Sequence, residues 1–576
     1  MNPQHIQYYD NIRRWLSSPF VDNQQIHPST IHYEISEKTT PSPLHKGKTI
    51  LIQQFYIDKN ISRHDENKFC LRKNVENMHI DEIILLNERE YNVNELGIKS
   101  DKIQQIIIKE RLTYSAAYKW AQDNHIDGYA ILANSDIFFD NTLNNVKMSN
   151  LHNEKKAFAL LRYEYHNHYK TYLNKCQLFG PRPDSQDVWI WHTRWKLSDK
   201  QLKLMNFCLG IPGCDNKIIY ILHTLGFICY NEPEWIRSYH YHTSQSRTYN
   251  ASTTRVPRPY YTIFPICNNA PQQHTYNTFN IVRENDNLRY YIENKIKHDE
   301  PFIIPRVASI EHTCAIFGNE IQKQSNNDVL NQQNLQSIVM VMKNNAGIQI
   351  STVNSLVEYA TLYMEAFKLA DTCFWWEPTS TVSGGHSPLH TEHRDFLINQ
   401  CKYPKIDAEA LDVFHHITRE PWTRALRRKR ILIVSPFADS MKEQIPIRQE
   451  IYGIDLFPEC EFVFLKPPQT CGDISREFNV ELNDFIDEIN KIKDSFDIAL
   501  CSCGGYGNLV CSAIYKMGKS AVYVGGVLQM YFGIYGKRWL NDKPDMLRLY
   551  LNKHWKRPSN SEKPTDFEKI KGGCYW

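Results

Sequence analysis

The amino-acid sequence predicts an α/β fold organised as two domains in tandem. Short apolar runs typical of buried strands alternate with amphipathic segments, and this alternation occurs in two series separated by polar sequence. The length of 576 residues is enough for several hydrophobic cores at roughly 150 residues per domain. Hydrophobic residues at 42% and charged residues at 23% are typical of a folded globular chain and exclude a largely disordered one.

The first series of predicted strands follows an N-terminal region, residues 1–45, in which we expect a short helix and a connector. A charged periodic segment and a helical pattern from Thr113 to Asp123 separate the strands. This alternation predicts a mostly parallel sheet. The apolar runs that we interpret as strands are 48–57, 82–86, 104–110 and 128–136.

The second series begins after a charge-rich stretch at 285–300, so we place a domain boundary near residue 290. Helical patterns at 353–370 and 406–417 precede the new strands, and one helix at 508–517 connects the last two in a βαβ unit. The predicted strands are 430–435, 461–465, 496–502 and 520–526. The sequence therefore predicts an N-terminal segment 1–45 and two domains, 46–290 and 291–576.

Charge balance, the lengths of the apolar runs and the cysteine content together argue against several classes of protein. Lys and Arg number 67 against 64 Asp and Glu, which leaves a formal net charge of +3 and no strong attraction to nucleic acid. No apolar stretch reaches the roughly 18 residues that span a bilayer, and the first residues lack an apolar signal core. With 15 Cys and no export signal, we expect reduced thiols and a cytoplasmic protein without a membrane span.

The string Ala133-Asn134-Ser135-Asp136 stands at the carboxyl end of a predicted strand. Ligands of open α/β sheets bind beyond that end of the strands. A carboxylate there can hold Mg²⁺ or Mn²⁺, and such a cation offsets the charge that builds on a nucleoside-diphosphate leaving group. The alternative interpretation is that Asp136 only caps a turn.

Three further clusters add to this candidate site. Asp187 stands beside a predicted strand that contains two Trp, and Asp215 opens a predicted helix at 215–225. Asp215 is therefore a helix cap or a catalytic base. His240 and His242 are candidate imidazole ligands. Together the clusters supply a metal carboxylate, a spare carboxylate and an imidazole, which is what glycosyl transfer needs.

Glycines mark the strand ends of the second series. They allow a backbone to approach a phosphate closely, and a helix N-terminus after them offers free N–H groups. Packing alone also requires such tight turns, so both interpretations stay open. The glycines that we single out as candidate donor-binding positions are Gly504, Gly505, Gly507, Gly525 and Gly526.

Several strings of the first half together resemble a known family. They are QQFY (53–56), CLRKNVEN (70–77), RLTY (111–114), ANSDIFFD (133–140), SQDVW (185–189), LGIPGCDN (209–216) and HYHTSQSRTY (240–249). Residues from about 49 to 250 resemble GT-A-type glycosyltransferases of bacterial surface-polysaccharide loci and large DNA viruses. The Asp-x-Asp triplet of such enzymes reads Asn134-Ser135-Asp136 here, so only its last carboxylate is present.

This resemblance implies roles for individual residues. Asp136 would hold the metal with His240 or His242, and Asp215 would be the base of an inverting displacement, with Asp187 as the second choice. The residues that would contact the sugar donor are Gln53, Gln54, Tyr56, Arg111, Asn134 and Asp136.

Strings of the second half occur in the same order as in another family. They are PRVASIE (305–311), PWTRAL (421–426), ILIVSPFADSMKEQ (431–444), FDIALCSCGGYG (496–507), VYVGGVLQMYFGIYGKRW (522–539) and GGCYW (572–576). This half resembles the GT-D-like domain of bacterial polysaccharide-cluster proteins. The resemblance implies that Arg306 and Glu311 line a donor site, although the Asp-x-Glu pair of the family reads Ser309-Ile310-Glu311 here.

The two resemblances imply tandem Rossmann-like nucleotide-sugar-binding domains, GT-A-type and then GT-D-like. We expect a hexosyl- or deoxyhexosyltransferase that uses UDP-, GDP- or dTDP-linked donors with Mn²⁺ or Mg²⁺ and extends a surface glycan, with both domains active. One alternative has an active first domain and a second domain that only binds or holds the glycan. Another is a carbohydrate-binding or assembly protein with decayed sites, because both triplets lack a carboxylate. Nucleic-acid binding is the least favoured function.

Overall fold

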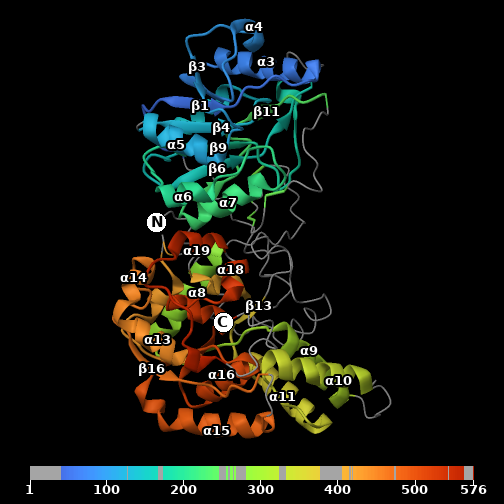
Figure 1. The fold of residues 1–576 in the computed structure, drawn as a ribbon, viewed down its shortest axis with the longest axis vertical. Helices are drawn as coiled ribbons and strands as arrows, with labels where there is room; N and C mark the ends of the chain where they lie inside the picture. The colour runs from blue at the N-terminus through green and yellow to red at the C-terminus, as the bar shows by residue number, and fades with distance from the viewer. Residues whose placement is uncertain are drawn as a thin grey trace. The chain divides into compact units, whose positions relative to one another are not determined.

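The computed structural model describes two compact units (Figure 1). The described residues up to Cys267 belong to the first unit and those from Ile281 onward to the second. The N-terminal helix predicted within residues 1–45 falls largely outside the described part of the chain. The residues described are 41–125, 127–166, 173–244, 255–256, 260–261, 263, 265–267, 281–323, 332–375, 405–413, 417, 420–471, 475–542, 544–563 and 575.

A seven-stranded sheet forms the centre of the first unit, in the order β10-β6-β9-β4-β1-β2-β3. Its neighbours are parallel except for the two pairs that β9 makes with β4 and β6. Every residue of β1, β4 and β9 is buried, as expected for strands covered on both faces. The strands are β1 (Thr49–Gln53), β2 (Glu82–Asn87), β3 (Ile103–Ile107), β4 (Tyr129–Ala133), β6 (Lys156–Leu160), β9 (Val188–His192) and β10 (Ile228–Tyr230).

Side-chain caps define where several helices of this unit begin. The side chains of Asn60, Thr113 and Ser198 each accept a hydrogen bond from a backbone N–H of the first turn that follows. The helices are α3 (Ile61–Glu76), α4 (Val93–Leu96), α5 (Tyr114–Asn124), α6 (Asp199–Leu204), α7 (Cys214–Thr224) and the 3₁₀ helix η2 (Asn141–Met148).

A smaller sheet of four strands, in the order β5-β11-β7-β8, brings distant segments together beside α3. In the antiparallel pair β5–β11, His240 lies opposite Ile137, which directly follows Asp136. This register places residues about a hundred positions apart in one site. The strands are β5 (Ile137–Phe139), β7 (Tyr163–Glu164), β8 (Gln177–Leu178) and β11 (Ser238–His240).

The second unit has a five-stranded, fully parallel sheet in the order β12-β18-β17-β15-β16. The strands are β12 (Ile303–Ile304), β15 (Arg430–Val434), β16 (Glu461–Leu465), β17 (Ile498–Cys501) and β18 (Ser520–Tyr523). Its helices are α8 (Ile281–Lys297), α9 (Ser309–Lys323), α10 (Gln332–Val341), α11 (Val353–Leu369), α13 (Ala438–Gln444), α14 (Arg448–Tyr452), α15 (Phe478–Lys491), α16 (Gly507–Lys516), α17 (Leu528–Tyr531), α18 (Lys537–Asp542) and α19 (Pro544–Tyr550). The predicted α/β class is confirmed.

The helix predicted at 406–417 is wrong over the residues that the structure describes there. Residues 405–407 form β14, which pairs in parallel with β13 (Cys373–Trp375), and the short 3₁₀ helix η7 (Ala408–Leu411) follows. The Asp407 side chain accepts a hydrogen bond from the backbone N–H of Glu409 at 2.9 Å. Pairing with a strand about thirty residues earlier therefore overrides the local helical pattern.

No helix in the described part of the chain combines the length and the apolar character that crossing a bilayer requires.

Candidate functional site

A cleft of about 820 Å³ opens in the first unit, where β1 and β4 end. Because β9 runs antiparallel to β4, Asp187 at its start reaches the same edge of the sheet as Asn134. Nearly all the residues that the sequence singles out in the first half line this cleft. They are Gln54, Tyr56, Arg111, Asn134, Asp136, Asp187, Asp215, His240 and His242.

Gln53 is the exception among the predicted donor contacts. Its side chain is 3% exposed and its Nε2 donates a hydrogen bond to the backbone oxygen of Asn134 at 2.7 Å. Asn74 on α3 donates to Gln53 Oε1 at 3.5 Å. We therefore correct the assignment of Gln53 as a donor contact. Gln53 is buried and holds the backbone of the segment that carries Asp136.

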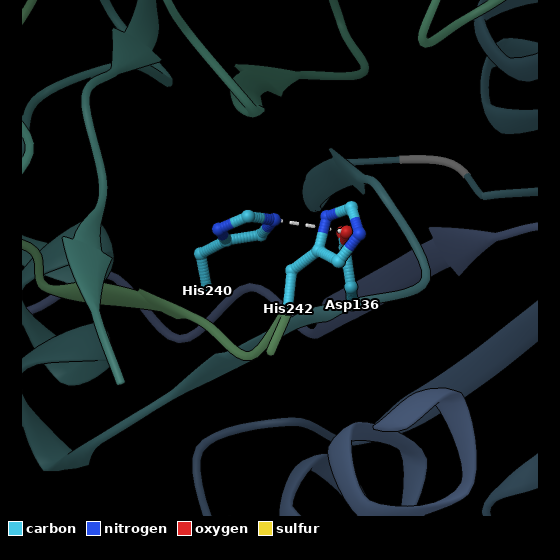
Figure 2. A group of neighbouring side chains, drawn as sticks. All are labelled: Asp136, His240 and His242. Carbon is cyan, nitrogen blue, oxygen red and sulfur yellow. Dashed lines mark hydrogen bonds and ion pairs between the residues drawn. The ribbon is translucent and has the colours of Figure 1, made fainter. Parts of the chain in front are cut away.

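Asp136, His240 and His242 form a cluster whose candidate ligand atoms all lie within 4.8 Å of one another (Figure 2). The backbone N–H of Tyr241 donates to the Asp136 carbonyl at 2.9 Å, which joins the two segments. Two buried atoms of the cluster, Asp136 Oδ1 and His242 Nε2, have no hydrogen-bond partner among the described residues. These two atoms are therefore available to bind a ligand in the cleft.

The other carboxylate oxygen of Asp136 is held by two cationic side chains. Oδ2 accepts from Arg63 Nη2 at 2.6 Å and from His240 Nε2 at 3.0 Å. Burial raises the pKa of Asp136, but attraction to His240 and Arg63 outweighs it and holds this pKa well below its ordinary value. Burial lowers the pKa of His240, yet Asp136 and Glu164 raise it to about 9. Asp136 is therefore ionised.

These residues fit a divalent cation, since a buried carboxylate oxygen and a buried imidazole nitrogen have no hydrogen-bond partner in the described part of the chain. Asp136, His240 and His242 would hold it, and His240 would give up its Nε2 proton on binding. One carboxylate and two imidazoles favour Mn²⁺ over Mg²⁺, because Mg²⁺ prefers oxygen ligands.

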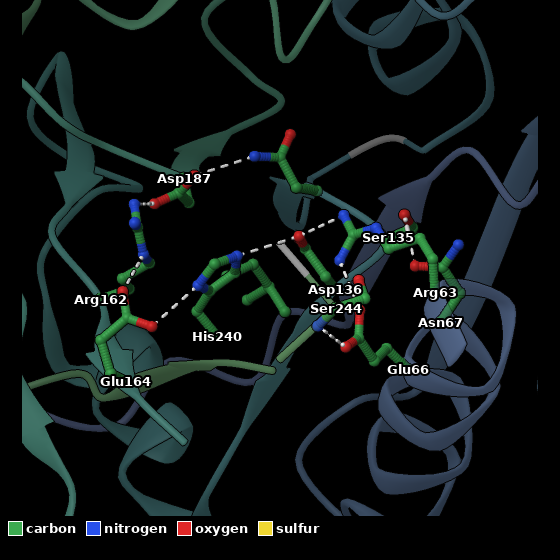
Figure 3. Close-up of polar contacts among 12 residues, drawn as sticks. Arg63, Glu66, Asn67, Ser135, Asp136, Arg162, Glu164, Asp187, His240 and Ser244 are labelled. Atoms are coloured by element: carbon green, nitrogen blue, oxygen red, sulfur yellow. Dashed lines mark hydrogen bonds and ion pairs between the residues drawn. The ribbon is translucent and has the colours of Figure 1, made fainter. Parts of the chain in front are cut away.

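A chain of polar contacts continues from this cluster to Asp187 (Figure 3). Glu164 Oε2 lies 3.1 Å from His240 Nδ1, and Arg162 Nε donates a hydrogen bond to Glu164 Oε1 at 2.9 Å. Arg162 Nη1 also donates to Asp187 Oδ2, while Asn134 Nδ2 donates to Asp187 Oδ1 at 2.9 Å. Both carboxylate oxygens of Asp187 are thus engaged, which favours a structural role over that of a base.

Sequence reasoning missed the partners that build this network. Arg162 and Glu164 stand two positions apart, so they face the same side of an extended chain, and this is the one local signal they offer. Arg63 on α3 reaches Asp136 across 73 positions, and no local pattern indicates that contact. Glu66, one helical turn later, accepts from the backbone N–H groups of residues 243 and 244 at 2.7 and 2.8 Å and holds the segment after His242.

Asp215 lies in the first turn of α7, but it is not the helix cap. That position belongs to Gly213, which adopts φ 83° and offers no side-chain hydrogen bond. Burial raises the pKa of Asp215 to about 7, a hydrogen bond from the Asn216 N–H lowers it, and repulsion from Asp187 and Asp184 raises it further. Such a carboxyl group can take up a proton near neutral pH, as a general base must.

In the second unit, protein atoms lie close to the glycines after β17, of which Gly505 and Gly507 are buried and Gly504 is exposed. A side chain at Gly504 would meet the Ala346 carbonyl at 2.9 Å, and one at Gly505 would overlap Ile348. A side chain at Gly507 would overlap the ring of Tyr523. Packing accounts for these three glycines, and their role in donor binding stays a prediction.

The glycines after β18 are packed in a similar way. A side chain at Gly525, which adopts φ 75°, would overlap the Arg306 guanidinium, and one at Gly526 would overlap Tyr575. Arg306 Nη1 donates to the Val524 carbonyl at 3.1 Å. Glu311, in the first turn of α9, is 9% exposed. Burial and the nearby Glu311 raise the pKa of the Tyr523 hydroxyl well above its ordinary value, and Arg306 opposes this. The structure thus brings Arg306 and Glu311 close to one tyrosine.

No protein-family model and no curated protein matches this chain. Among solved structures, a mannosyltransferase from Pyrobaculum calidifontis in complex with GDP-Man and Mn²⁺ is 10% identical over 69% of this chain and 91% of its own, with a TM-score of 0.25. A glycosyltransferase of domain of unknown function 1792 from Streptococcus sanguinis is 11% identical over 49% of this chain and 95% of its own, with a TM-score of 0.28. A putative glucose-1-phosphate thymidylyltransferase from Bacillus anthracis is 9% identical over 32% and 86%, with a TM-score of 0.21. Two of these three neighbours are glycosyltransferases.

Proposed function

We propose that the first unit is a glycosyltransferase that takes a sugar from a UDP-, GDP- or dTDP-linked donor and adds it to a glycan. One observation carries the proposal. A single cleft at the strand ends holds both an ionised carboxylate with two imidazoles and a separate carboxyl group whose pKa lies near 7. A metal-assisted, inverting transfer from a nucleotide sugar uses both groups, one for the leaving diphosphate and one for the attacking hydroxyl.

The donor end of the cleft is the cluster of Asp136, His240 and His242. A cation bound there would neutralise negative charge on the leaving diphosphate. Arg63 fixes the position of the Asp136 carboxylate through Oδ2, which leaves Oδ1 open for the cation. Tyr56 and Gln54 line the same cleft after β1, and Gln54 is anchored because its Oε1 accepts from the Leu112 N–H at 3.0 Å.

The acceptor end is Asp215. Its carboxylate accepts the Asn216 N–H at 2.9 Å and a hydrogen bond from the Gln186 N–H, and it takes the proton of the acceptor hydroxyl. The hydroxyl oxygen then bonds to the anomeric carbon while the bond from that carbon to the diphosphate breaks, with inversion. Asp187 has a structural role, because its two oxygens accept hydrogen bonds from Arg162 and Asn134 and so link these two residues in the wall of the cleft.

For the second unit, the packing of its glycine turns supports the version in which it binds or holds the glycan without turnover. The competing version, in which Arg306 and Glu311 serve a second donor, predicts sequential addition of two sugars by one chain. Substituting Glu311→Gln in the full chain separates them. Unchanged overall transfer supports the holding role, and loss of a second addition supports two active sites.

The decisive experiment for the first unit measures nucleotide binding and turnover in the full chain. UDP, GDP and dTDP are titrated by calorimetry with and without Mn²⁺ or Mg²⁺, and hydrolysis of the matching nucleotide sugar is followed. Asp136→Ala is expected to abolish the metal-promoted binding, whereas Asp215→Asn keeps binding and loses turnover. Asp140→Asn is the matched control, because Asp140 follows the other end of β5 and is not among the residues that line the cleft. Nucleotide affinity that does not depend on the metal and is unchanged in Asp136→Ala would refute the proposal.

A further inference from the structure

We propose that the acceptor carries an anionic group, a sugar carboxylate or phosphate, and that Arg111 and Arg255 bind it beside Asp215. This inference rests on the proposed function and adds to it the chemical class of the acceptor. It comes from an inventory of the cationic side chains around the cleft, because a guanidinium that already has a carboxylate partner is less available to a ligand than one that has none.

Six arginines line the cleft, and four of them are paired. Arg63 contacts Asp136 and Glu66, and Arg162 contacts Glu164 and Asp187. Arg89 pairs with Glu95 and Arg182 with Asp184. The remaining two have no carboxylate partner among the described residues. The arginines of the cleft are Arg63, Arg89, Arg111, Arg162, Arg182 and Arg255.

The two remaining arginines are anchored near the two ends of one loop, residues 209–213, which leads into α7. Arg111 Nη2 donates to the Leu209 carbonyl at 2.9 Å. Arg255 Nε donates to the Tyr260 hydroxyl at 3.2 Å, and the next residue, Val256, donates its backbone N–H to the Pro212 carbonyl at 3.1 Å. Each guanidinium is therefore fixed by a neutral acceptor and keeps its other N–H donors for a ligand.

Two glycines of this loop adopt the left-handed backbone conformation, which favours glycine. Gly210 adopts φ 68°, and a side chain there would come within 3.4 Å of Arg111 Nη2. Gly213 adopts φ 83°, and a side chain there would come within 2.5 Å of the Tyr260 hydroxyl, which Arg255 contacts. The backbone conformation therefore favours glycine at both positions, and Gly213 also leaves room for the Tyr260 hydroxyl that anchors Arg255.

The position of the pair favours the acceptor over the donor. Arg111 contacts this loop directly, and Arg255 is tied to it through the neighbouring Val256. The loop leads into α7, whose first turn holds Asp215, the group assigned to the acceptor hydroxyl. The donor diphosphate is assigned instead to the cation site formed by Asp136, His240 and His242. An acceptor whose hydroxyl reaches Asp215 would place a neighbouring substituent near the two arginines, and guanidinium groups bind carboxylate and phosphate best.

The test compares matched neutral and anionic sugars as ligands of the full chain. Glucose is compared with glucuronate and with glucose 6-phosphate, and galactose with galacturonate, by calorimetry with and without Mn²⁺ and the best-bound nucleoside diphosphate. We expect at least one anionic sugar to bind about tenfold more tightly than its neutral partner, as for a charge-assisted hydrogen bond. The double variant Arg111→Gln, Arg255→Gln is expected to reduce this ratio to about two or less.

Arg89→Gln is the control, because Arg89 lines the same cleft but is paired with Glu95, and it should leave the ratio unchanged. Equal binding of neutral and anionic sugars to the wild-type chain overturns the inference. So does a double variant that keeps the ratio, or one that loses affinity for the nucleoside diphosphate, which would place the arginines at the donor. A wild-type chain that prefers anionic sugars but binds no nucleotide refutes the proposed function and leaves the anion site standing.

Discussion

Replacing Asp215 by Asn should make the protein more stable and less active at the same time. The pKa of this carboxyl group is raised from 3.8 to about 7, mainly by burial. Below about pH 4 this carboxyl group is protonated in both the folded and the unfolded chain, so its burial carries no ionisation cost. As the pH rises from about 4 to 7 the unfolded chain loses this proton first, and the free energy of unfolding falls. Above pH 7 the folded chain therefore carries the full cost of an ionised, buried carboxylate.

The size of this cost follows from the shift. About three pKa units at 1.36 kcal/mol each give about 4 kcal/mol as an upper bound above pH 7. Water at the cleft and local relaxation reduce it, so we expect Asp215→Asn to gain about 1–3 kcal/mol at pH 8. Asn keeps the acceptor for the Asn216 N–H. In a unit of this size such a gain raises Tm by roughly 2–4 °C per kcal/mol.

The assay is thermal unfolding of wild type and Asp215→Asn between pH 5.5 and 8.5, together with kcat/KM. The gain in Tm should grow over this range, and activity should fall by about 10²- to 10⁴-fold. The wild-type kcat/KM should rise about tenfold per pH unit below 7 and then level off.

Asp187→Asn provides the contrast to this variant. It should lower Tm, because Arg162 loses a carboxylate partner, and it should shift the activity profile towards lower pH, because Asp187 helps to raise the pKa of Asp215. An Asp215→Asn variant with unchanged Tm and full turnover would refute this account.

Three further changes test the surroundings of the site and the second unit. Glu164→Gln, which weakens the support of His240, should lower Mn²⁺ affinity by about 10- to 100-fold in a calorimetric titration, and unchanged affinity would remove Glu164 from the site. Gly213→Ala should lower stability by about 1–3 kcal/mol, because φ is 83° and the new methyl group would lie 2.5 Å from the Tyr260 hydroxyl. Gly505→Ala should cost a similar amount in the second unit by crowding its packed neighbour, whereas retained stability together with weakened nucleotide binding would revive the donor role of that turn. Chemical denaturation followed by circular dichroism measures both glycine variants.

Local patterns in the sequence were sufficient for the main strands and for the strand-end position of Asp136. Buried parallel strands are continuous apolar runs bounded by polar residues, so residues 49–53, 129–133 and 430–434 can be recognised without any knowledge of their partners. The prediction of a helix at 406–417 was wrong because the first residues of this segment pair with β13. The local sequence pattern carries no information about a strand that lies about thirty residues earlier.

By itself, the sequence determined which carboxylates and imidazoles stand at the ends of the strands. Only the tertiary structure decided their surroundings. It engaged both oxygens of Asp187 and buried Asp215 with its pKa near 7. It also brought Arg63 from 73 positions away to one oxygen of Asp136. The physical reason is that ionisation and hydrogen bonding depend on neighbours in space, and the β5–β11 register and helix α3 bring those neighbours from remote parts of the chain.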